Sequence, residues 1–171
     1  IFDGLVREMN LLAAKHNAKQ TEAQEVDARR LLIKSVINGY NTILLQQENI
    51  RIALSDMDFN DKLLKETELK FEAGAVPLSD VLNFKIKYNN AESGLINAQY
   101  NYATAKYALA ILMGLTDATI PETVKFPSVS ALSEETLMGI DVYLDMALSN
   151  RPDLKAYREA LESAKYTMYS K

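Results

Sequence analysis

The sequence contains no Cys and no Trp, a single His, and few helix-breaking residues, with six Gly and four Pro among 171 residues. The absence of Cys excludes disulfide frameworks, Cys-based zinc sites and thiol nucleophiles. The shortage of Gly and Pro argues against a β-sandwich or a barrel, which needs many turns. The longest strongly apolar stretch, residues 107–115, is far shorter than the roughly 20 residues of a membrane-spanning helix. We therefore expect long, regular helices and no transmembrane helix.

The residues of common enzymatic sites are also scarce. His16 is the only His, so the Glu-x-x-His pairs of di-iron proteins and the His clusters of zinc hydrolases are missing. The Gly residues are scattered singly and form no phosphate-binding loop. We expect His16 to be an exposed helical residue, and we expect no catalytic residues, no metal, no cofactor and no enzymatic activity. The net charge of −4, with Lys and Glu interspersed, argues against a nucleic-acid partner.

What the sequence does have is a long heptad repeat. No Pro occurs between Asp3 and Ala73, Asp3 can cap the start of a helix, and Gly74 can end it in a left-handed conformation. A seven-residue apolar repeat imposes a left-handed supercoil on the helices that pack along it. The repeat consists of Val36, Ile43, Ile50, Met57, Leu64 and Phe71. We place a second, increasingly polar seam position four residues after its members, at Tyr40, Gln47, Leu54, Asp61 and Glu68.

A second repeat follows a short break at residues 74–80. Pro77 cannot continue the first helix, whereas Ser79 and Asp80 are good residues for opening the next one. The sequence thus predicts an all-α, elongated fold, in which residues 1–115 form a long antiparallel coiled-coil hairpin with its tip at 74–80. Its helices should span residues 3–73 and 78–113. The second helix presents two apolar seam positions, Val81, Tyr88, Leu95, Tyr102 and Leu109 at one and Phe84, Ala91, Ala98, Ala105 and Leu112 at the other.

Residues 116–171 form the second expected region. Residues 116–132 contain two Pro and indicate an irregular connector with room for one short edge strand. Ser133 is expected to cap a short helix, and Pro152 to open a last helix. Because the return helix of the hairpin is only half as long as the outgoing one, part of the outgoing helix needs another partner. The last helix can supply some of it to Met9, Leu12, Val26 and Leu32.

Several short segments form a recognisable set. Phe-Glu-Ala-Gly at 71–74, followed by Leu-Ser-Asp-Val-Leu at 78–82, resembles the tip signature of the TolC-type outer-membrane efflux proteins. Residues 107–114 resemble the end of that family's ascending helix, and residues 147–154 resemble its Ala-Leu…Arg-Pro-Asp-Leu signature. Phe-Asp-Gly at 2–4 also fits the exit from that family's barrel strands. The order and spacing of these segments cover nearly the whole chain.

The resemblance implies a trimeric efflux or secretion channel whose outer-membrane β-barrel continues into a periplasmic α-helical tunnel. Residues 3–73 would descend, residues 78–113 would ascend to an equatorial region, and residues 152–171 would begin the next ascent. The implied partners are a periplasmic adaptor protein, an inner-membrane pump and further copies of the chain. We expect a soluble, periplasmic piece of a Gram-negative channel, cut from a longer polypeptide, which meets the membrane only through the barrel outside these residues.

The tip is the first candidate functional site. From the resemblance we expect Gly74, Val76, Leu78, Ser79 and Asp80 to contact the adaptor. Gly74 would set the turn, Val76 and Leu78 would pack, and Ser79 with Asp80 would cap the helix and form hydrogen bonds. The alternative is a turn that merely reverses the chain.

The acidic end of the first helix is the second candidate site. Asp58, Asp61 and Glu68 are candidate tunnel-lining residues that would attract cations. The alternative is a solvated face with ion pairs between successive turns. For the protein as a whole, the alternative is a coiled-coil scaffolding or signalling module. Such a module needs heptads, but it has no reason to carry the Arg-Pro-Asp-Leu helix start.

Overall fold

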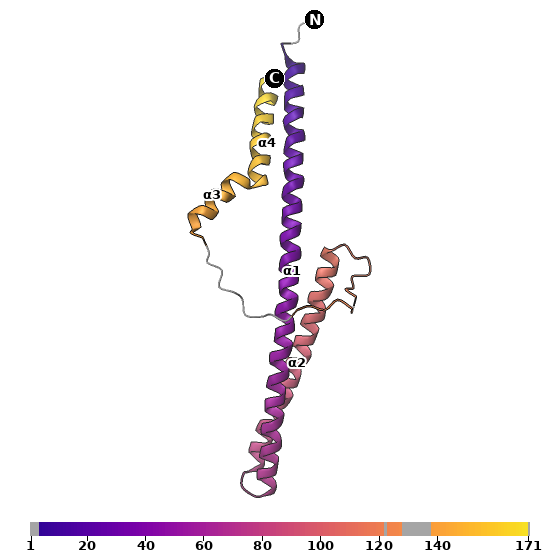
Figure 1. Cartoon of the computed structure of the whole chain (residues 1–171), viewed down its shortest axis with the longest axis vertical. Coiled ribbons are helices and arrows are strands. Elements are labelled where there is room, and N and C mark those ends of the chain that lie inside the picture. Colours follow the sequence, from indigo (N-terminus) through magenta and orange to yellow (C-terminus); the bar gives the residue numbers. More distant parts are fainter. Residues whose placement is uncertain (1–3, 122, 128–137, 171) are drawn as a thin grey trace. The chain divides into compact units, whose positions relative to one another are not determined.

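The computed structural model describes residues 4–121, 123–127 and 138–170. Within these ranges the chain is all-helical and contains no β-strand (Figure 1). The prediction of an all-α fold with a long first helix and a shorter return helix is confirmed. Asp3 and Ser133, the expected helix caps, lie outside the described residues. The helices are α1 (Val6–Glu72), α2 (Leu78–Leu112), α3 (Ile140–Asn150) and α4 (Pro152–Tyr169).

Packing divides the chain into two compact units. Unit 1 comprises residues 1–34 and 133–171, and unit 2 comprises residues 35–132. The boundary expected at residue 115 rests on the order of the motifs along the chain and stays a prediction. Each unit has packing of its own, so the two are described separately.

Unit 2 is an antiparallel hairpin of α2 and the second part of α1. Ile43 has no exposed surface and packs with Ala105 and Leu109 in the core of the hairpin. The connector after α2 adds Ile120 and Phe126 to this cluster, although residues 123–127 form no edge strand. All members of the predicted α1 repeat are buried or half-buried except Phe71, which is exposed because the hairpin ends beside it.

The second seam position of α1 lies three residues after each member of the repeat, and not four as expected. The predicted seam positions four residues after the repeat are wrong for Tyr40, Leu54 and Glu68, because these side chains are exposed. Small side chains suit the observed position because they let α2 approach closely. A Cβ atom on Gly39 would lie only 3.2 Å from Leu109 Cδ1. The observed set is Gly39, Gln46, Ala53, Asn60 and Thr67, none of which is exposed.

In unit 1, α4 packs antiparallel to the first part of α1. Ala13, Ala156 and Ser163 are the buried residues of this contact, and the Ser163 hydroxyl donates a hydrogen bond of 3.1 Å to the Ala13 carbonyl. Side chains this small hold the two helices close together. None of the residues of α3 is buried. The expected partnership of the last helix with α1 is present for Met9 and Leu12, which are half-buried, whereas Val26 and Leu32 are exposed.

His16 lies in the seam between α1 and α4, which corrects the expectation of an exposed helical residue. Its side chain is only 20% exposed, and its Nδ1 atom lies 2.6 Å from Glu159 Oε2. The imidazole also stacks on the Tyr166 ring, with 5.4 Å between the ring centroids. Both partners come from the far end of the sequence, so no local pattern around His16 could reveal them.

Candidate functional site

The hairpin tip begins where α1 ends at Glu72. The Gly74 amide donates to the Phe71 carbonyl at 2.8 Å, and the Ala75 amide donates to the Lys70 carbonyl at 2.9 Å. This pair of bonds is a Schellman motif, which satisfies carbonyl groups at the helix end. Gly74 itself has a φ of 71°, a left-handed conformation that strains any residue with a side chain. Gly74 therefore ends the helix and sets the direction of the turn.

The helix α2 begins without a side-chain cap. Its N-cap residue is Pro77, in an extended conformation with φ −77° and ψ 159°, and it makes no side-chain cap hydrogen bond. Ser79 and Asp80 are the second and third residues of the helix, so the expectation that they cap it is wrong. Asp80 still places a negative charge in the first turn, where the helix dipole favours it. The amides of Leu78 and Ser79 have no acceptor within the helix, which leaves them to solvent or a partner.

Apolar side chains gather at the tip. Leu78 is 53% exposed and Phe71 is 41% exposed, while Val76 is half-buried in the turn. Leu82 lies one helical turn after Leu78 and is 51% exposed. The sequence analysis did not single out Leu82, although residues four apart share one face of a helix. The tip thus presents more apolar surface than the turn residues alone provide.

The three acidic residues proposed as tunnel lining do not form one cluster. Asp61 accepts a hydrogen bond of 2.6 Å from the Lys65 ammonium. This hydrogen bond and the charge of Asp61 raise the pKa of Lys65. Asp58 and Glu68 are exposed, and Glu68 lies two helical turns beyond Asp61 on nearly the same side of α1. Asp61 is thus paired with Lys65, whereas Asp58 and Glu68 leave their charge open to solvent, and a tunnel lining of these three residues stays a prediction.

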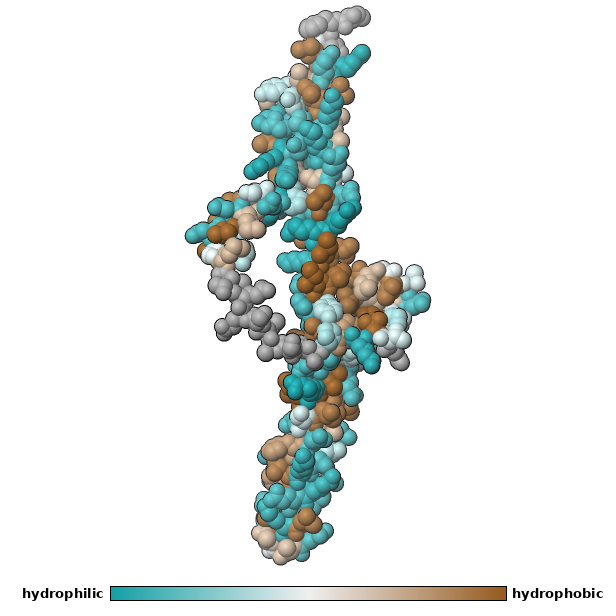
Figure 2. Space-filling model, viewed as in Figure 1, coloured by the Kyte–Doolittle hydropathy of each residue, from teal (hydrophilic) through white to brown (hydrophobic). Residues whose placement is uncertain are grey.

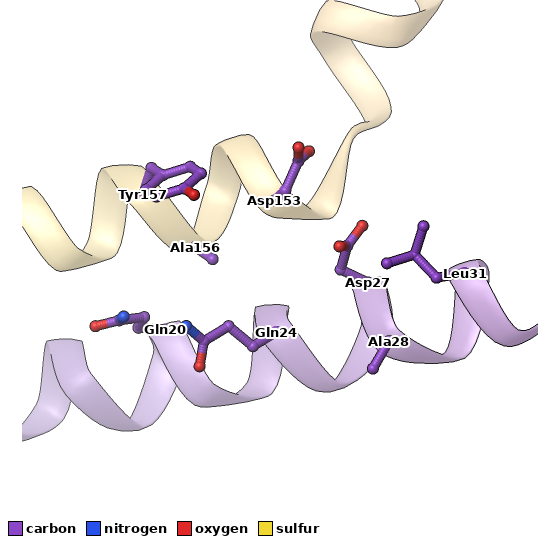
Figure 3. Close-up of a pocket in the computed structure, with 8 residues that line it drawn as sticks. All are labelled: Gln20, Gln24, Asp27, Ala28, Leu31, Asp153, Ala156 and Tyr157. Atoms are coloured by element: carbon purple, nitrogen blue, oxygen red, sulfur yellow. The ribbon is translucent and has the colours of Figure 1, made fainter.

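A pocket of about 260 Å³ lies between α1 and α4 in unit 1 (Figure 3). Asp27 on α1 and Asp153 on α4 line it, together with the Tyr157 ring. Both carboxylates are already paired, Asp27 with Arg30 at 2.7 Å and Asp153 with Arg151 at 2.5 Å. The Arg151 guanidinium lowers the pKa of Asp153, which keeps that carboxyl ionised. Asp153 is therefore poorly suited to proton transfer.

The described residues offer little else for chemistry. In the part of the chain that the structure covers, no group of three or more His, Asp or Glu side chains could hold a metal ion. Among the described helices, none combines the length and the apolar character needed to span a bilayer. The tip of unit 2 is therefore the site that the geometry favours for a function.

Comparison with known proteins places the hairpin in a family. The model of the outer membrane efflux protein family matches residues 1–115, which include all of α1, the tip and α2. No curated protein matches the chain. Members of this family are components of outer membrane efflux channels and are not enzymes. Because the match covers well over half of the sequence and includes the tip, the chain belongs to the outer membrane efflux protein family.

Proposed function

We propose that this chain forms a periplasmic tunnel segment of a trimeric outer-membrane efflux channel and binds a periplasmic adaptor protein through its hairpin tip. The channel acts as a passive conduit that the adaptor joins to an inner-membrane pump. The observation that carries the proposal is the tip itself, where a family hairpin ends in exposed apolar side chains at Leu78 and Leu82.

The tip has the composition of a small docking surface. An apolar centre at Phe71, Leu78 and Leu82 adjoins backbone amides at the start of α2 that lack intrahelical acceptors. Interfaces commonly combine an apolar centre with a polar rim of this kind. Ser79 and Asp80 are close enough along the helix to supply the rim.

A photo-cross-linking residue placed at Ser79 in the full-length channel tests the docking directly. We expect a covalent adduct with the adaptor protein in cells that express the whole pump, because Ser79 is exposed at the tip. The same cross-linker at Gln99, an exposed residue in the middle of α2, is the matched control and should give little adduct. Equal adducts at both positions, or an adduct at Gln99 alone, would contradict docking through the tip.

The second proposal is that Asp58 and Glu68 bias the tunnel toward cations. Replacing both with their amides, Asp58→Asn and Glu68→Gln, should lower the cation-to-anion permeability ratio of the channel in a planar bilayer. The effect should shrink in high salt, since exposed charges are screened beyond about 10 Å at 0.1 M. Lys62→Gln, which removes a neighbouring positive charge, should shift the ratio in the opposite direction. An unchanged ratio in the acidic double variant would mean that these side chains do not line the conduit.

The coiled-coil scaffolding module remains the alternative function. The match of residues 1–115 to an efflux family disfavours it, because a scaffold has no need of that family's sequence. A channel variant that loses the tip contacts but keeps its helices should still assemble. Assembly without adaptor docking would separate a docking function of the tip from a scaffolding function of the helices.

A further inference from the structure

A small pocket lies where the connector after α2 packs against the end of that helix. It has a volume of about 270 Å³ and belongs wholly to unit 2. Figure 2 shows apolar and hydrophilic side chains next to each other where the connector meets α2. The lining residues are Tyr102, Ala103, Lys106 and Tyr107 on α2, and Thr119 and Ile120 on the connector. The pocket is thus separate from the tip, which lies at the other end of α2.

Helix geometry brings the four α2 residues together. Residues four apart are neighbours on a helix surface, so Lys106 lies beside Tyr102, and Tyr107 lies beside Ala103. Ala103 carries only a methyl group, so it leaves a depression among these larger side chains. Tyr107 is 53% exposed and offers a ring against which an aromatic group can pack.

Two of the lining residues are held in place by the hydrophobic core. Tyr102 and Ile120 pack against the buried cluster of unit 2 and also line the pocket. Their positions are set by the fold, so a ligand does not have to order them on binding. Fixing the wall of a site in advance lowers the entropic cost of association.

Lys106 supplies the pocket with a positive charge that no described residue neutralises. Its ammonium lies 5.7 Å from the centroid of the Tyr102 ring, and the side chain is half-buried. Lys65, Lys70 and Lys165 each lie 2.6 Å from a carboxylate oxygen. Lys106 forms no ion pair with any residue that the structure describes. A half-buried cation attracts an anion more strongly than a fully hydrated one, because less water screens it.

We propose that this pocket binds a small aromatic carboxylate, with its ring against Ala103 and Tyr107 and its carboxylate at Lys106. The Thr119 hydroxyl has no hydrogen-bond partner among the described residues and can donate to the same carboxylate. One cation and one hydroxyl suit a singly charged group better than a doubly charged phosphate. The volume suits a single-ring acid, since pockets for larger ligands commonly span roughly 300–1,000 Å³. The inference goes beyond the proposed function and depends on neither the adaptor nor the trimer.

Equilibrium dialysis of the purified full-length channel against radiolabelled benzoate tests the site. We expect saturable binding at one site per chain. Acetate, a carboxylate without a ring, and benzylamine, an aromatic cation of similar size, should each compete at least about tenfold more weakly than unlabelled benzoate. Absence of saturable binding, or equal competition by either compound, would overturn the proposal.

Substitutions assign the binding to this pocket. Lys106→Gln should weaken benzoate binding about tenfold or more, whereas Lys106→Arg, which keeps the charge, should retain most of it. Ala103→Leu should block the site by filling the depression, and Leu at this exposed helical position is compatible with the helix. Lys87→Gln is the matched control, because Lys87 also lies over an aromatic ring of α2, 4.9 Å from the Phe84 centroid, but does not line this pocket.

The variants also separate this site from the tip. Unchanged benzoate binding in both Lys106→Gln and Ala103→Leu, or an equal loss in Lys87→Gln, would overturn the proposal. Circular dichroism of each variant checks that the helices are intact, so that a loss of binding is not a loss of folding. Adaptor cross-linking at Ser79 is measured on the same variants and should be unchanged, which distinguishes failure of this site from failure of docking at the tip.

Discussion

Under the proposed docking, replacing Leu78 with Asp in the full-length channel should abolish export and adaptor cross-linking without preventing assembly of the proposed trimer. Leu78 is 53% exposed at the first position of α2, so the folded hairpin tolerates a charge there. A docked adaptor would bury that charge without a partner, which is strongly unfavourable. Loss of a hot-spot contact near the centre of an interface costs about 2 kcal/mol or more, equivalent to roughly a 30-fold weaker complex. Export assays and cross-linking at Ser79 measure the two effects.

Two further variants make this result specific. Val76→Asp should act in the same direction, although Val76 is half-buried in the turn and some of its effect will come from the turn itself. Asn83→Asp is the matched control, because it adds the same charge at an exposed position of α2 without removing apolar surface. Normal export by a channel that carries both Val76→Asp and Leu78→Asp would contradict docking at the tip and would mean that the turn merely reverses the chain.

Replacing Ile43 with Ala should be the most destabilising single change in the hairpin. Ile43 is fully buried among Ala105 and Leu109, so truncation removes apolar contacts and leaves a cavity between two long helices. The free energy of unfolding should fall by about 2–5 kcal/mol. Urea unfolding of the chain, followed by the circular dichroism of its helices, measures this difference.

Two other truncations calibrate the effect. Leu95→Ala should cost less than Ile43→Ala, because Leu95 is only half-buried in the same seam. Leu69→Ala should change the unfolding free energy by no more than about 0.5 kcal/mol, since Leu69 is 67% exposed. Equal losses for Ile43 and Leu69 would contradict the seam as described.

The fold of the hairpin could be predicted because its determinants are local or strictly periodic. A heptad repeat read along the chain identifies the buried face of a helix, and Gly74 followed by Pro77 marks where one helix must end and another begin. The tip segment was identified for the same reason, since turn residues between two heptad repeats leave few places for the chain to reverse. The level of each residue above the tip then follows from simple counting.

The polar details of the tip could not be predicted so well. Ser79 and Asp80 have the composition of helix caps, yet Pro77 occupies the N-cap position because the chain leaves the turn in an extended conformation. Residue preference at a helix start is a weak prior that turn geometry overrides by two residues. Similarly, the companion seam position fell three residues after the repeat, since Gly39 and Ala53 admit closer packing of α2 than Tyr40 and Leu54 would.

By itself the sequence determined the helices, the reversal at residues 74–80 and the apolar seam of the hairpin, because each depends on neighbours within a few turns of the same helix. The sequence also offered the last helix as a partner for the start of α1, but only the tertiary structure decided which residues form that contact and what surrounds His16. Glu159 and Tyr166 reach His16 from the far end of the chain, and the buried contact beside it consists of Ala13 and Ser163. Side chains that small leave no apolar pattern in the sequence, so the pairing of α1 with α4 is specified by close backbone approach and by polar groups that meet only after the chain has folded.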